Sequence, residues 1–401
     1  MSIRKREWTT PAGAQKMAWL VDYRDSQGKR RAKQFARKKD ADAFVTKSGW
    51  EVSQGTHTAD SQSITVRAAA ENWLARGRRE GLEAATLDAY DQHVRLHINP
   101  FIGARKLNQL TKPMVEEFRD TLLDNGRSRA MAKRVLGDLT SIIKEAERLG
   151  AVAKNVAHGV TVKRSGRDKP KVVPPTKEHL RLLISAAEKA RPMDKPLLLV
   201  LILAGLRASE VRALTWRHVD LQRATITIDQ RADYKNVIGP PKSASGFRTI
   251  PVPAMLVAEL RRWKLRCAPS ALDLVFPSQE GTPIFHTNLV FGFQEPLQVM
   301  AGLVRQKVNA KTGKAVVDAD GAPVLEGTYS LHDFRHAAAS LWIEKRVQPK
   351  RVQTWMGHHS IQVTFDTYGH LFAATEDDSA IMAALEADMM TAAPTHSEGA
   401  A

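Results

Sequence analysis

The sequence predicts a mixed α/β, mostly α-helical protein of several domains: a small β-β-α module, a helical bundle, and an α-rich domain with a small β-sheet. Three observations point to this fold class. The 401 residues suffice for two or three domains of about 150 residues each. Apolar residues recur at helical spacing along most of the chain, whereas strand patterns are few and short. A cationic, proline-rich stretch at 163–175 separates the bundle from the third domain.

The first two parts of the chain have distinct patterns. Residues 17–35 predict two short strands around a glycine-containing turn, and a helix follows from Lys38 to about Gln54. Residues 65–150 predict four helices, the second of which stops at the NPFIG segment at 99–103. We therefore expect a module over 1–58, a helical domain over 63–165 and a linker over 166–175.

The third domain is expected over 176–375. Its ten-residue apolar run at 197–206 predicts a buried helix, because crossing a bilayer takes about 20 residues. Strands are expected around 224–252, and residues 305–327 resemble an inserted hairpin with two glycine turns. The tail at 376–401 carries Ile381, Leu385 and Met389 at the spacing of a short helix.

The charge distribution predicts a polyanionic partner. Lys and Arg exceed Asp and Glu by 17 in all, with excesses of 7 in residues 1–58, 6 in 59–167 and 10 in 168–375. Neutralising phosphates releases condensed counterions, which favours binding, but charge alone does not separate DNA from RNA or from an anionic membrane. The tail, by contrast, has six acidic and no basic residues. A single cysteine, and no apolar signal-peptide core near the N-terminus, indicate a reducing, cytoplasmic location.

Two basic residues of the third domain, Arg207 and Lys242, indicate a functional site only when they are considered together with other residues. Arg207 ends the buried apolar run, and Glu210, three residues later, is placed to pair with its guanidinium group. Lys242 follows a strand-like segment, so we expect it on a β-hairpin. Taken alone, Arg207 and Glu210 fit a structural ion pair as well as they fit a site, and a single lysine on a hairpin is usually a solvated surface charge.

The C-terminal part of this domain concentrates reactive side chains. HDFRH at 332–336, MGHH at 356–359 and TYGH at 367–370 hold five of the 13 histidines within 39 residues. They also contain a second arginine, Arg335, and one of only five tyrosines, Tyr368. Because a guanidinium group binds phosphate and a phenol is a nucleophile, this combination predicts phosphoryl transfer.

These residues, in this order, resemble the tyrosine recombinase family, the phage-integrase type of site-specific recombinase. The matching positions are Arg207, Lys242, His332, Arg335, His358 and Tyr368. The sequence around these positions matches too, with GLRASE at the first arginine, LHDFRH at the second, and MGHHS, whose His358 lies ten residues before Tyr368. The resemblance covers most of the chain. It implies an arm-type DNA-binding module at 1–58, a core-binding domain at 63–165 and a catalytic domain at 176–375.

The resemblance implies that several of these residues bind the scissile phosphate. Arg207 and Arg335 grip its oxygens and stabilise the transition state, and His332 and His358 add hydrogen bonds. Glu210 fits a supporting acidic position. The resemblance implies no metal ion and no cofactor.

It also implies a covalent step. Tyr368 attacks the phosphate and forms a 3′-phosphotyrosine, while His332 assists the loss of its proton. Lys242 protonates the departing 5′ oxygen. Because the covalent link conserves the bond energy, DNA strands can be exchanged and rejoined without ATP.

The implied partners are double-stranded DNA attachment sites of core and arm type. Four copies form a homotetramer on DNA, in which the tail at 376–401 docks on a neighbouring subunit; a tail packed on its own body is the alternative. An accessory DNA-bending or excision factor is a further implied partner, and no membrane is involved. The implied enzyme integrates and excises a phage or other mobile element at the bacterial nucleoid.

Three other functions stay open at this point. The HDFRH segment at 332–336 imitates a zinc-binding HExxH motif, although aspartate replaces the needed glutamate. A non-catalytic DNA-binding regulator would share the basic domains, but it has no use for a nucleophile. A type IB topoisomerase would share the chemistry, but it needs no second DNA-binding module.

Overall fold

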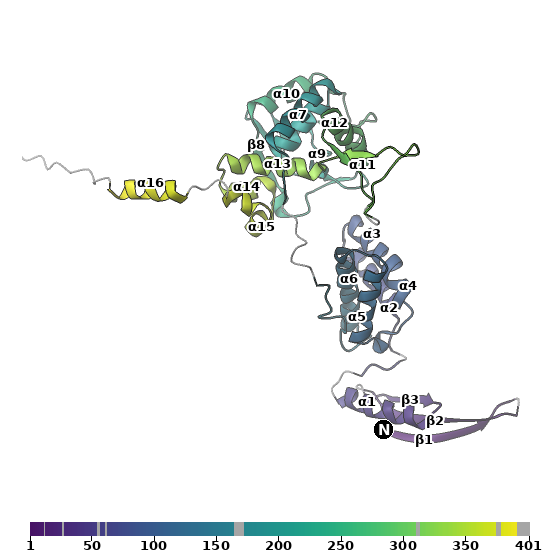
Figure 1. Ribbon diagram of the computed structural model, residues 1–401. Helices are drawn as coiled ribbons and strands as arrows, with labels where there is room; N and C mark the ends of the chain where they lie inside the picture. The colour runs from purple at the N-terminus through teal and green to yellow at the C-terminus, as the bar shows by residue number, and fades with distance from the viewer. Residues whose placement is uncertain are drawn as a thin grey trace, which may run out of the picture. The chain divides into compact units, whose positions relative to one another are not determined.

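The computed structural model describes residues 1–11, 13–25, 28–53, 57–60, 62–163, 172–309, 313–373 and 378–390. The chain forms two compact units, Met1–Asp168 and Lys169–Ala401 (Figure 1). Both are mostly helical with small sheets, which confirms the predicted fold class. Most of the expected linker and residues 391–401 of the expected tail lie outside the described residues. Within the described ranges, no helix is long and apolar enough to cross a membrane.

The N-terminal sheet has one strand more than the sequence predicted. It is antiparallel with the order β1-β2-β3, and α1 packs against it (Figure 1). The elements are β1 (Ser2–Thr9), β2 (Gln15–Arg24), β3 (Arg30–Phe35) and α1 (Lys38–Ser53). The predicted β-β-α module is therefore β-β-β-α. The additional strand escaped prediction because only Ile3 and Trp8 are half-buried on an edge strand whose other side chains are exposed and mostly polar or charged.

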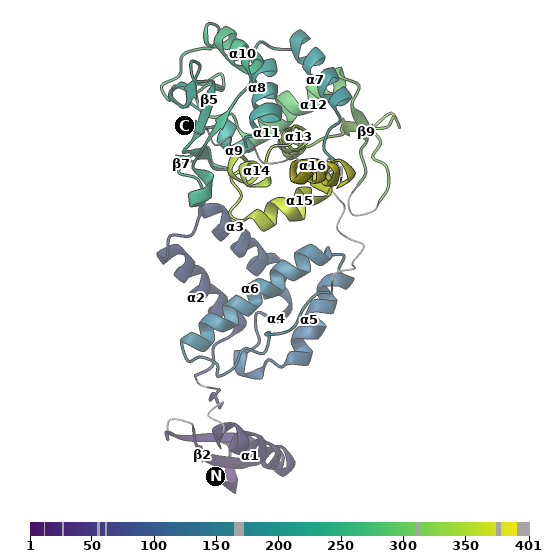
Figure 2. The same cartoon turned by 90° about the vertical axis from the view of Figure 1, so that its left-hand side faces the viewer.

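A helical bundle forms the rest of the first unit. Its helices, several of which Figure 2 shows side by side, are α2 (Val66–Arg79), α3 (Ala84–His93), α4 (Asn99–Ile102), α5 (Lys112–Asp124) and α6 (Arg129–Arg148). The second predicted helix ends within the NPFIG segment, as expected: a π-helical turn, Val94–Ile98, joins α3 directly to α4, which ends at Ile102.

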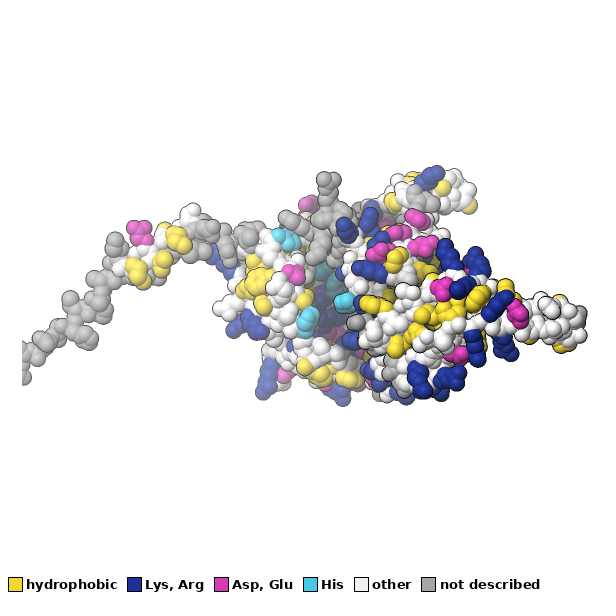
Figure 3. All heavy atoms as spheres, turned by 90° about the horizontal axis from the view of Figure 1, so that it is seen from below, with side chains coloured by type: hydrophobic (Ala, Val, Ile, Leu, Met, Phe, Trp, Pro, Cys, Tyr) yellow, Lys and Arg dark blue, Asp and Glu magenta, His cyan; other side chains and the backbone are white. Residues whose placement is uncertain are grey.

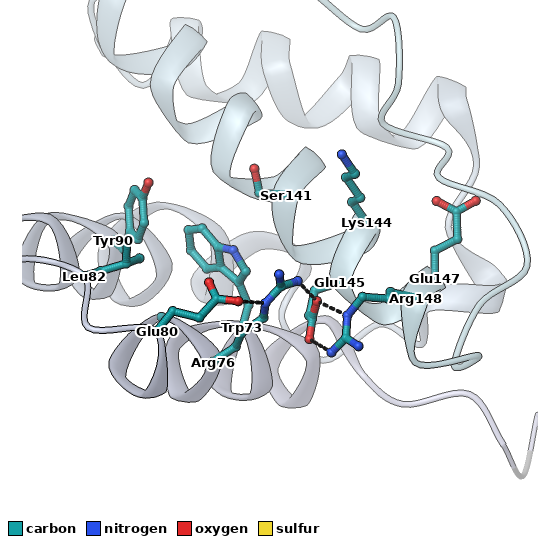
Figure 4. A pocket seen from close by; sticks show the side chains of 11 residues that line it. Trp73, Arg76, Glu80, Leu82, Tyr90, Ser141, Lys144, Glu145, Glu147 and Arg148 are labelled. Carbon is teal, nitrogen blue, oxygen red and sulfur yellow. Dashed lines mark hydrogen bonds and ion pairs between the residues drawn. The ribbon is translucent and has the colours of Figure 1, made fainter.

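A buried carboxylate joins two helices of this bundle. Glu145 of α6 accepts hydrogen bonds from Arg76 of α2 and, at 2.7 and 2.9 Å, from Arg148 (Figure 4). The bonds from Arg148 and Arg76 lower the pKa of Glu145 to about 2. The ion pairs line a pocket beside Trp73 and Tyr90, which belongs to the bundle and contains none of the predicted site residues.

The second unit is built around a buried helix that ends at the site. This helix runs from α8 through a π-helical segment at Val200–Ala204, and α13 packs against it. The helices are α7 (Lys177–Lys189), α8 (Asp194–Leu199), α9 (Ala208–Val211), α10 (Ala254–Lys264), α11 (His286–Leu289), α12 (Glu295–Met300), α13 (Leu331–Glu344), α14 (Pro349–Met356), α15 (Ile361–Ala373) and α16 (Asp378–Met390). Figure 1 shows α13, α14 and α15 grouped together.

Three small sheets complete this unit. An antiparallel sheet has the order β4-β5-β8, a second pairs β6 with β7, and a third pairs β9 with β10. The strands are β4 (Val219–Asp220), β5 (Thr225–Ile228), β6 (Arg231–Ala232), β7 (Ile238–Gly239), β8 (Arg248–Pro251), β9 (Val304–Gln306) and β10 (Leu325–Gly327). The last pair closes the expected insertion, in which Gly313 and Gly321 adopt the left-handed backbone conformation of its turns; residues 310–312 lie outside the described part.

We expect Leu139→Ala to destabilise the first unit by about 2–5 kcal/mol, because it leaves a cavity among packed helices. Leu139 is fully buried on α6. Urea unfolding followed by circular dichroism measures the loss of unfolding free energy. Lys133→Ala, an exposed position on the same helix, is the matched control. A loss in Leu139→Ala no larger than that in the control contradicts the prediction.

Candidate active site

The end of the buried helix places the first predicted arginine. Gly205 ends this helix in a left-handed conformation, with φ of +61°. A side chain at this position would meet α13, since a Cβ atom would lie 3.0 Å from the Cβ of Ala338. Glycine therefore lets the chain turn sharply beside α13. Arg207 follows as the N-cap residue of α9.

The guanidinium group of Arg207 has hydrogen bonds to two residues, and its side chain remains partly exposed to solvent. Its guanidinium group donates to Glu210 Oε1 at 2.7 Å and to the Gly357 carbonyl at 2.9 Å. Its backbone N–H donates to the other oxygen of Glu210 at 2.8 Å. About a third of its side chain is exposed, at 35%. The predicted pair of Arg207 and Glu210 is thus present, and the guanidinium group still faces solvent.

The carboxylate of Glu210 is the centre of a larger cluster. Arg248 donates to its two oxygens at 2.9 and 2.7 Å, and Arg335 lies 4.0 Å away. Burial alone would raise the pKa of Glu210, but the bonds from Arg248 and the charges of Arg335 and Arg207 lower it to about 2. Glu210 is therefore ionised at neutral pH. Three guanidinium groups surround a single carboxylate, which leaves an excess of positive charge suited to an anion.

Arg335 joins the two ends of the site. It lies in α13, is only 1% exposed, and donates to the carbonyls of Gly205 and Met356. Burial and the neighbouring Arg207 lower its pKa to about 9. The two carbonyls therefore connect this guanidinium to the end of the buried helix and to the end of α14.

Tyr368 lies on α15 with its hydroxyl covered. It is 1% exposed, and its hydroxyl lies 2.6 Å from Nδ1 of His336 on α13. Its ring is nearly parallel to that of His358, with the centroids 6.3 Å apart and the planes inclined by 12°. Burial raises the pKa of Tyr368, and the positive charges of Arg335 and Arg207 offset only part of this rise. The hydroxyl is therefore protonated in this state.

The other two predicted histidines are His358, whose ring neighbours that of Tyr368, and His332, whose ring neighbours that of His336. His358 follows the left-handed Gly357 at the end of α14, and its Nδ1 is 2.9 Å from the Thr364 hydroxyl. Burial and the cations around it lower the pKa of His358 to about 3. His332 is exposed on α13, and its ring stands edge to face with that of His336 at 4.6 Å. The structure thus brings His358 to the tyrosine, and His332 to the neighbouring ring of His336.

Lys242 lies at the border of the cluster. It is exposed in the segment that leads from β7 to β8. This segment is attached to the site, because a Cβ atom on Gly357 would lie 2.9 Å from the Ser245 carbonyl oxygen. Arg248, at the start of β8, also donates to the Trp355 carbonyl at 2.7 Å. The position of Lys242 is thus fixed at its base.

Two residues of the site were missed by the sequence analysis. Arg248 is buried in β8, at a position that alternates with exposed ones and is ordinarily apolar. This alternation within the strand could have predicted its burial. His336 is part of the HDFRH segment, one turn after His332 on the same helix face. Among the described residues, no three His, Cys, Asp or Glu side chains gather as ligands for a metal ion.

Comparisons with known proteins identify relatives of this chain. Residues 176–375 match the sequence profile of the phage integrase family. The chain is 24% identical to the ICEBs1 integrase of Bacillus subtilis strain 168 over 291 residues, which cover 72% of this chain and 74% of that protein. It is also 24% identical to a XerC-like tyrosine recombinase of Caldanaerobacter subterraneus over 379 residues, covering 87% and 90%. The chain therefore belongs to the phage integrase family of tyrosine recombinases.

Solved structures share the fold. The Tn1549 transposon integrase, in complex with a circular intermediate DNA, superposes with a TM-score of 0.63 at 18% identity, over 81% of this chain and 99% of that one. A lambda integrase tetramer bound to a Holliday junction gives a TM-score of 0.56 at 16% identity, over 88% and 95%. At sequence identities this low, the structural similarity establishes a shared fold only.

We expect the melting temperature of the protein to fall as the pH is lowered from 7 to 5. The pKa values of His336 and His358 are lowered to about 4 and about 3, from an ordinary value of 6.5. In this window the unfolded chain binds protons that the folded chain does not, so acid favours unfolding. Differential scanning calorimetry measures the slope. His358→Gln should flatten it, whereas His359→Gln, exposed one residue later, should not. Equal slopes in all three proteins contradict this expectation.

Proposed function

We propose that this protein is a site-specific DNA recombinase that cleaves and rejoins DNA through a 3′-phosphotyrosine intermediate. It integrates, and also excises, a phage or other mobile element. The observation that carries this function is the position of Tyr368, beside a cluster in which three arginines surround one carboxylate. Membership of the phage integrase family supports the same reaction class. A protein that only binds DNA has no need for a nucleophile at this position.

The arginine cluster supplies the electrostatic part of catalysis. A phosphodiester gains negative charge on its non-bridging oxygens as the nucleophile approaches. Arg207 and Arg335 are proposed to bind these oxygens, because a planar guanidinium group matches a pair of phosphate oxygens. Since Glu210 and the surrounding carbonyls already hold both groups, little reorganisation is needed at the moment of reaction. No step of this scheme requires a metal ion.

The covalent steps need a nucleophile and an acid. The Tyr368 oxygen attacks phosphorus, and the P–O5′ bond breaks. Lys242 is proposed to protonate the departing 5′ oxygen, and its exposed position in the segment between β7 and β8 leaves the side chain accessible to bound DNA. His332 and His358 donate hydrogen bonds to the phosphate in this scheme. The phosphotyrosine bond retains the energy of the phosphodiester, so that rejoining does not consume ATP.

The charge of the chain supports a DNA substrate held over a large surface. Lys and Arg side chains outnumber acidic ones on the face that Figure 3 presents. We assign residues 1–58 to arm-type sites, 63–165 to core sites and 176–375 to catalysis. A lambda integrase tetramer has been solved on a Holliday junction, and we assign the same assembly, four copies on two core sites, to this chain.

The tail contributes to that assembly in this proposal. Helix α16 exposes the apolar side chains of Met382, Leu385 and Met389, which are 52–75% accessible. Its surroundings in the sequence are acidic, whereas the rest of the chain is basic. The helix is therefore suited to a neighbouring subunit rather than to DNA, and an accessory DNA-bending or excision factor would complete the complex.

Tyr368→Phe should abolish covalent capture of DNA. Phenylalanine keeps the ring contact with His358 but lacks the attacking oxygen. The measurement uses a nicked suicide substrate that carries the attachment site, with adducts detected on a denaturing gel. Loss of the adduct together with unchanged DNA binding is the expected result. If the phenylalanine variant still forms an adduct, the nucleophile is a different residue. Relaxation of supercoiled plasmid lacking any attachment site would instead indicate a topoisomerase.

Lys242→Ala should slow cleavage of the ordinary substrate by roughly 100-fold or more, because the 5′ oxygen leaves without a proton. A substrate with sulfur in place of that bridging oxygen should restore the rate, since a thiolate leaves without protonation. Lys235→Ala, a lysine of the preceding β6–β7 turn, serves as the control. Failure of the sulfur substrate to rescue the variant would remove Lys242 from the acid role.

A further inference from the structure

The contact between His336 and Tyr368 has the geometry of a proton transfer. Nδ1 of the imidazole lies 2.6 Å from the phenolic oxygen, and the two rings meet at 68° with centroids 5.5 Å apart. His336 sits on α13 and Tyr368 on α15, so this bond joins the two helices that carry the second arginine and the nucleophile. We propose that His336 is the general base that takes the proton of Tyr368 as it attacks DNA. This inference rests on the recombinase function proposed above.

The protonation state of the pair fits this direction of transfer. Burial, together with His332, lowers the pKa of His336 to about 4, so its imidazole is neutral. A neutral imidazole has one nitrogen that accepts and one that donates. For the base role, the ring hydrogen lies on Nε2, so that the protonated hydroxyl of Tyr368 donates and Nδ1 accepts. The acceptor lone pair already points at the proton that must leave.

The other histidines of the site are placed differently. Nδ1 of His358 is occupied by the Thr364 hydroxyl, and its ring stacks on the face of Tyr368. His332 reaches the tyrosine only through the ring of His336. The described contacts therefore give the base role to His336, whereas His332, on the exposed side, remains available to the phosphate.

DNA binding should strengthen this base. On α13, His332 and Arg335 lower its pKa while Asp333 raises it. Tyr368 faces it from α15, His358 stacks behind the tyrosine, and the packed segment Val200–Ala204 contributes no ionisable side chain. A phosphodiester bound at the arginine cluster adds a negative charge that offsets the repulsion from Arg335. The pKa of His336 then moves up, towards the pH at which a general base is most effective.

The proposed step is balanced. The hydroxyl proton of Tyr368 moves to Nδ1 of His336, the oxygen forms a bond to phosphorus, and the P–O5′ bond breaks with its electron pair on the 5′ oxygen. Lys242 supplies the proton for that oxygen. In rejoining, the 5′ hydroxyl returns its proton to Lys242 and attacks the phosphotyrosine, the bond between phosphorus and the Tyr368 oxygen breaks, and His336 returns the proton to the leaving phenolate. The same histidine thus acts as base in cleavage and as acid in ligation.

The test measures cleavage by His336→Asn with the 5′ sulfur substrate, whose leaving group needs no proton. The asparagine oxygen can accept the tyrosine hydrogen bond in place of Nδ1 but does not bind a proton at neutral pH. We expect unchanged DNA binding and a cleavage rate about 100-fold lower at pH 7. We also expect the cleavage rate of His336→Asn to keep rising with pH in the range where the rate of the unmodified protein no longer changes. His359→Asn, exposed and outside the cluster, is the matched control.

A second measurement separates proton transfer from positioning. A fluorinated tyrosine at position 368, with a hydroxyl that ionises near neutral pH, should restore cleavage to His336→Asn. In the protein with His336 intact, the same analogue should remove the acidic limb of the pH profile, and this readout stands even if the His336 variants do not fold. A His336→Asn rate and pH profile equal to those of the unmodified protein, or an acidic limb unchanged by the analogue, overturns the base role. No covalent adduct from the unmodified protein would instead overturn the recombinase function itself.

Discussion

The carboxylate of Glu210 is the interaction on which the site depends. It is buried, and it is surrounded by the guanidinium groups of Arg207, Arg248 and Arg335, which come from α9, β8 and α13. A buried arginine without a partner is prohibitively costly, so this single anion makes the convergence of the three elements possible. One carboxylate does not neutralise three cations. The remaining positive charge suits the site to an anion such as a phosphate.

The same cluster organises the backbone around it. The arginines donate to carbonyls at the ends of two helices: Gly205 after the buried helix, and Trp355, Met356 and Gly357 at the end of α14. Carbonyls at a helix end lack intrahelical partners, so cations satisfy them and interact favourably with the helix dipole. His358 follows directly after this helix end, which is how a segment distant in sequence brings its imidazole to the tyrosine.

The sequence predicted those features of the fold and site that are marked by residues close together in the chain. The helices carried their periodicity within a few turns, as at 197–206, and the motif residues were marked by adjacent glycines, Gly205 and Gly357. Strand β1 gave no such signal, because most of its side chains face solvent. The functions of Arg248 and His336 arise from contacts 38 and 32 residues away along the chain, with Glu210 and Tyr368. Such contacts form only through the tertiary fold.

The burial of Tyr368 has a consequence for the host genome. A strongly basic protein spends most of its time on DNA of arbitrary sequence, because counterion release does not depend on the bases. Each such encounter brings phosphates near the arginines, but the tyrosine hydroxyl is covered and bonded to His336. Because a covered hydroxyl does not reach a phosphate, the packing of this single side chain disfavours cleavage during such encounters and so protects the chromosome.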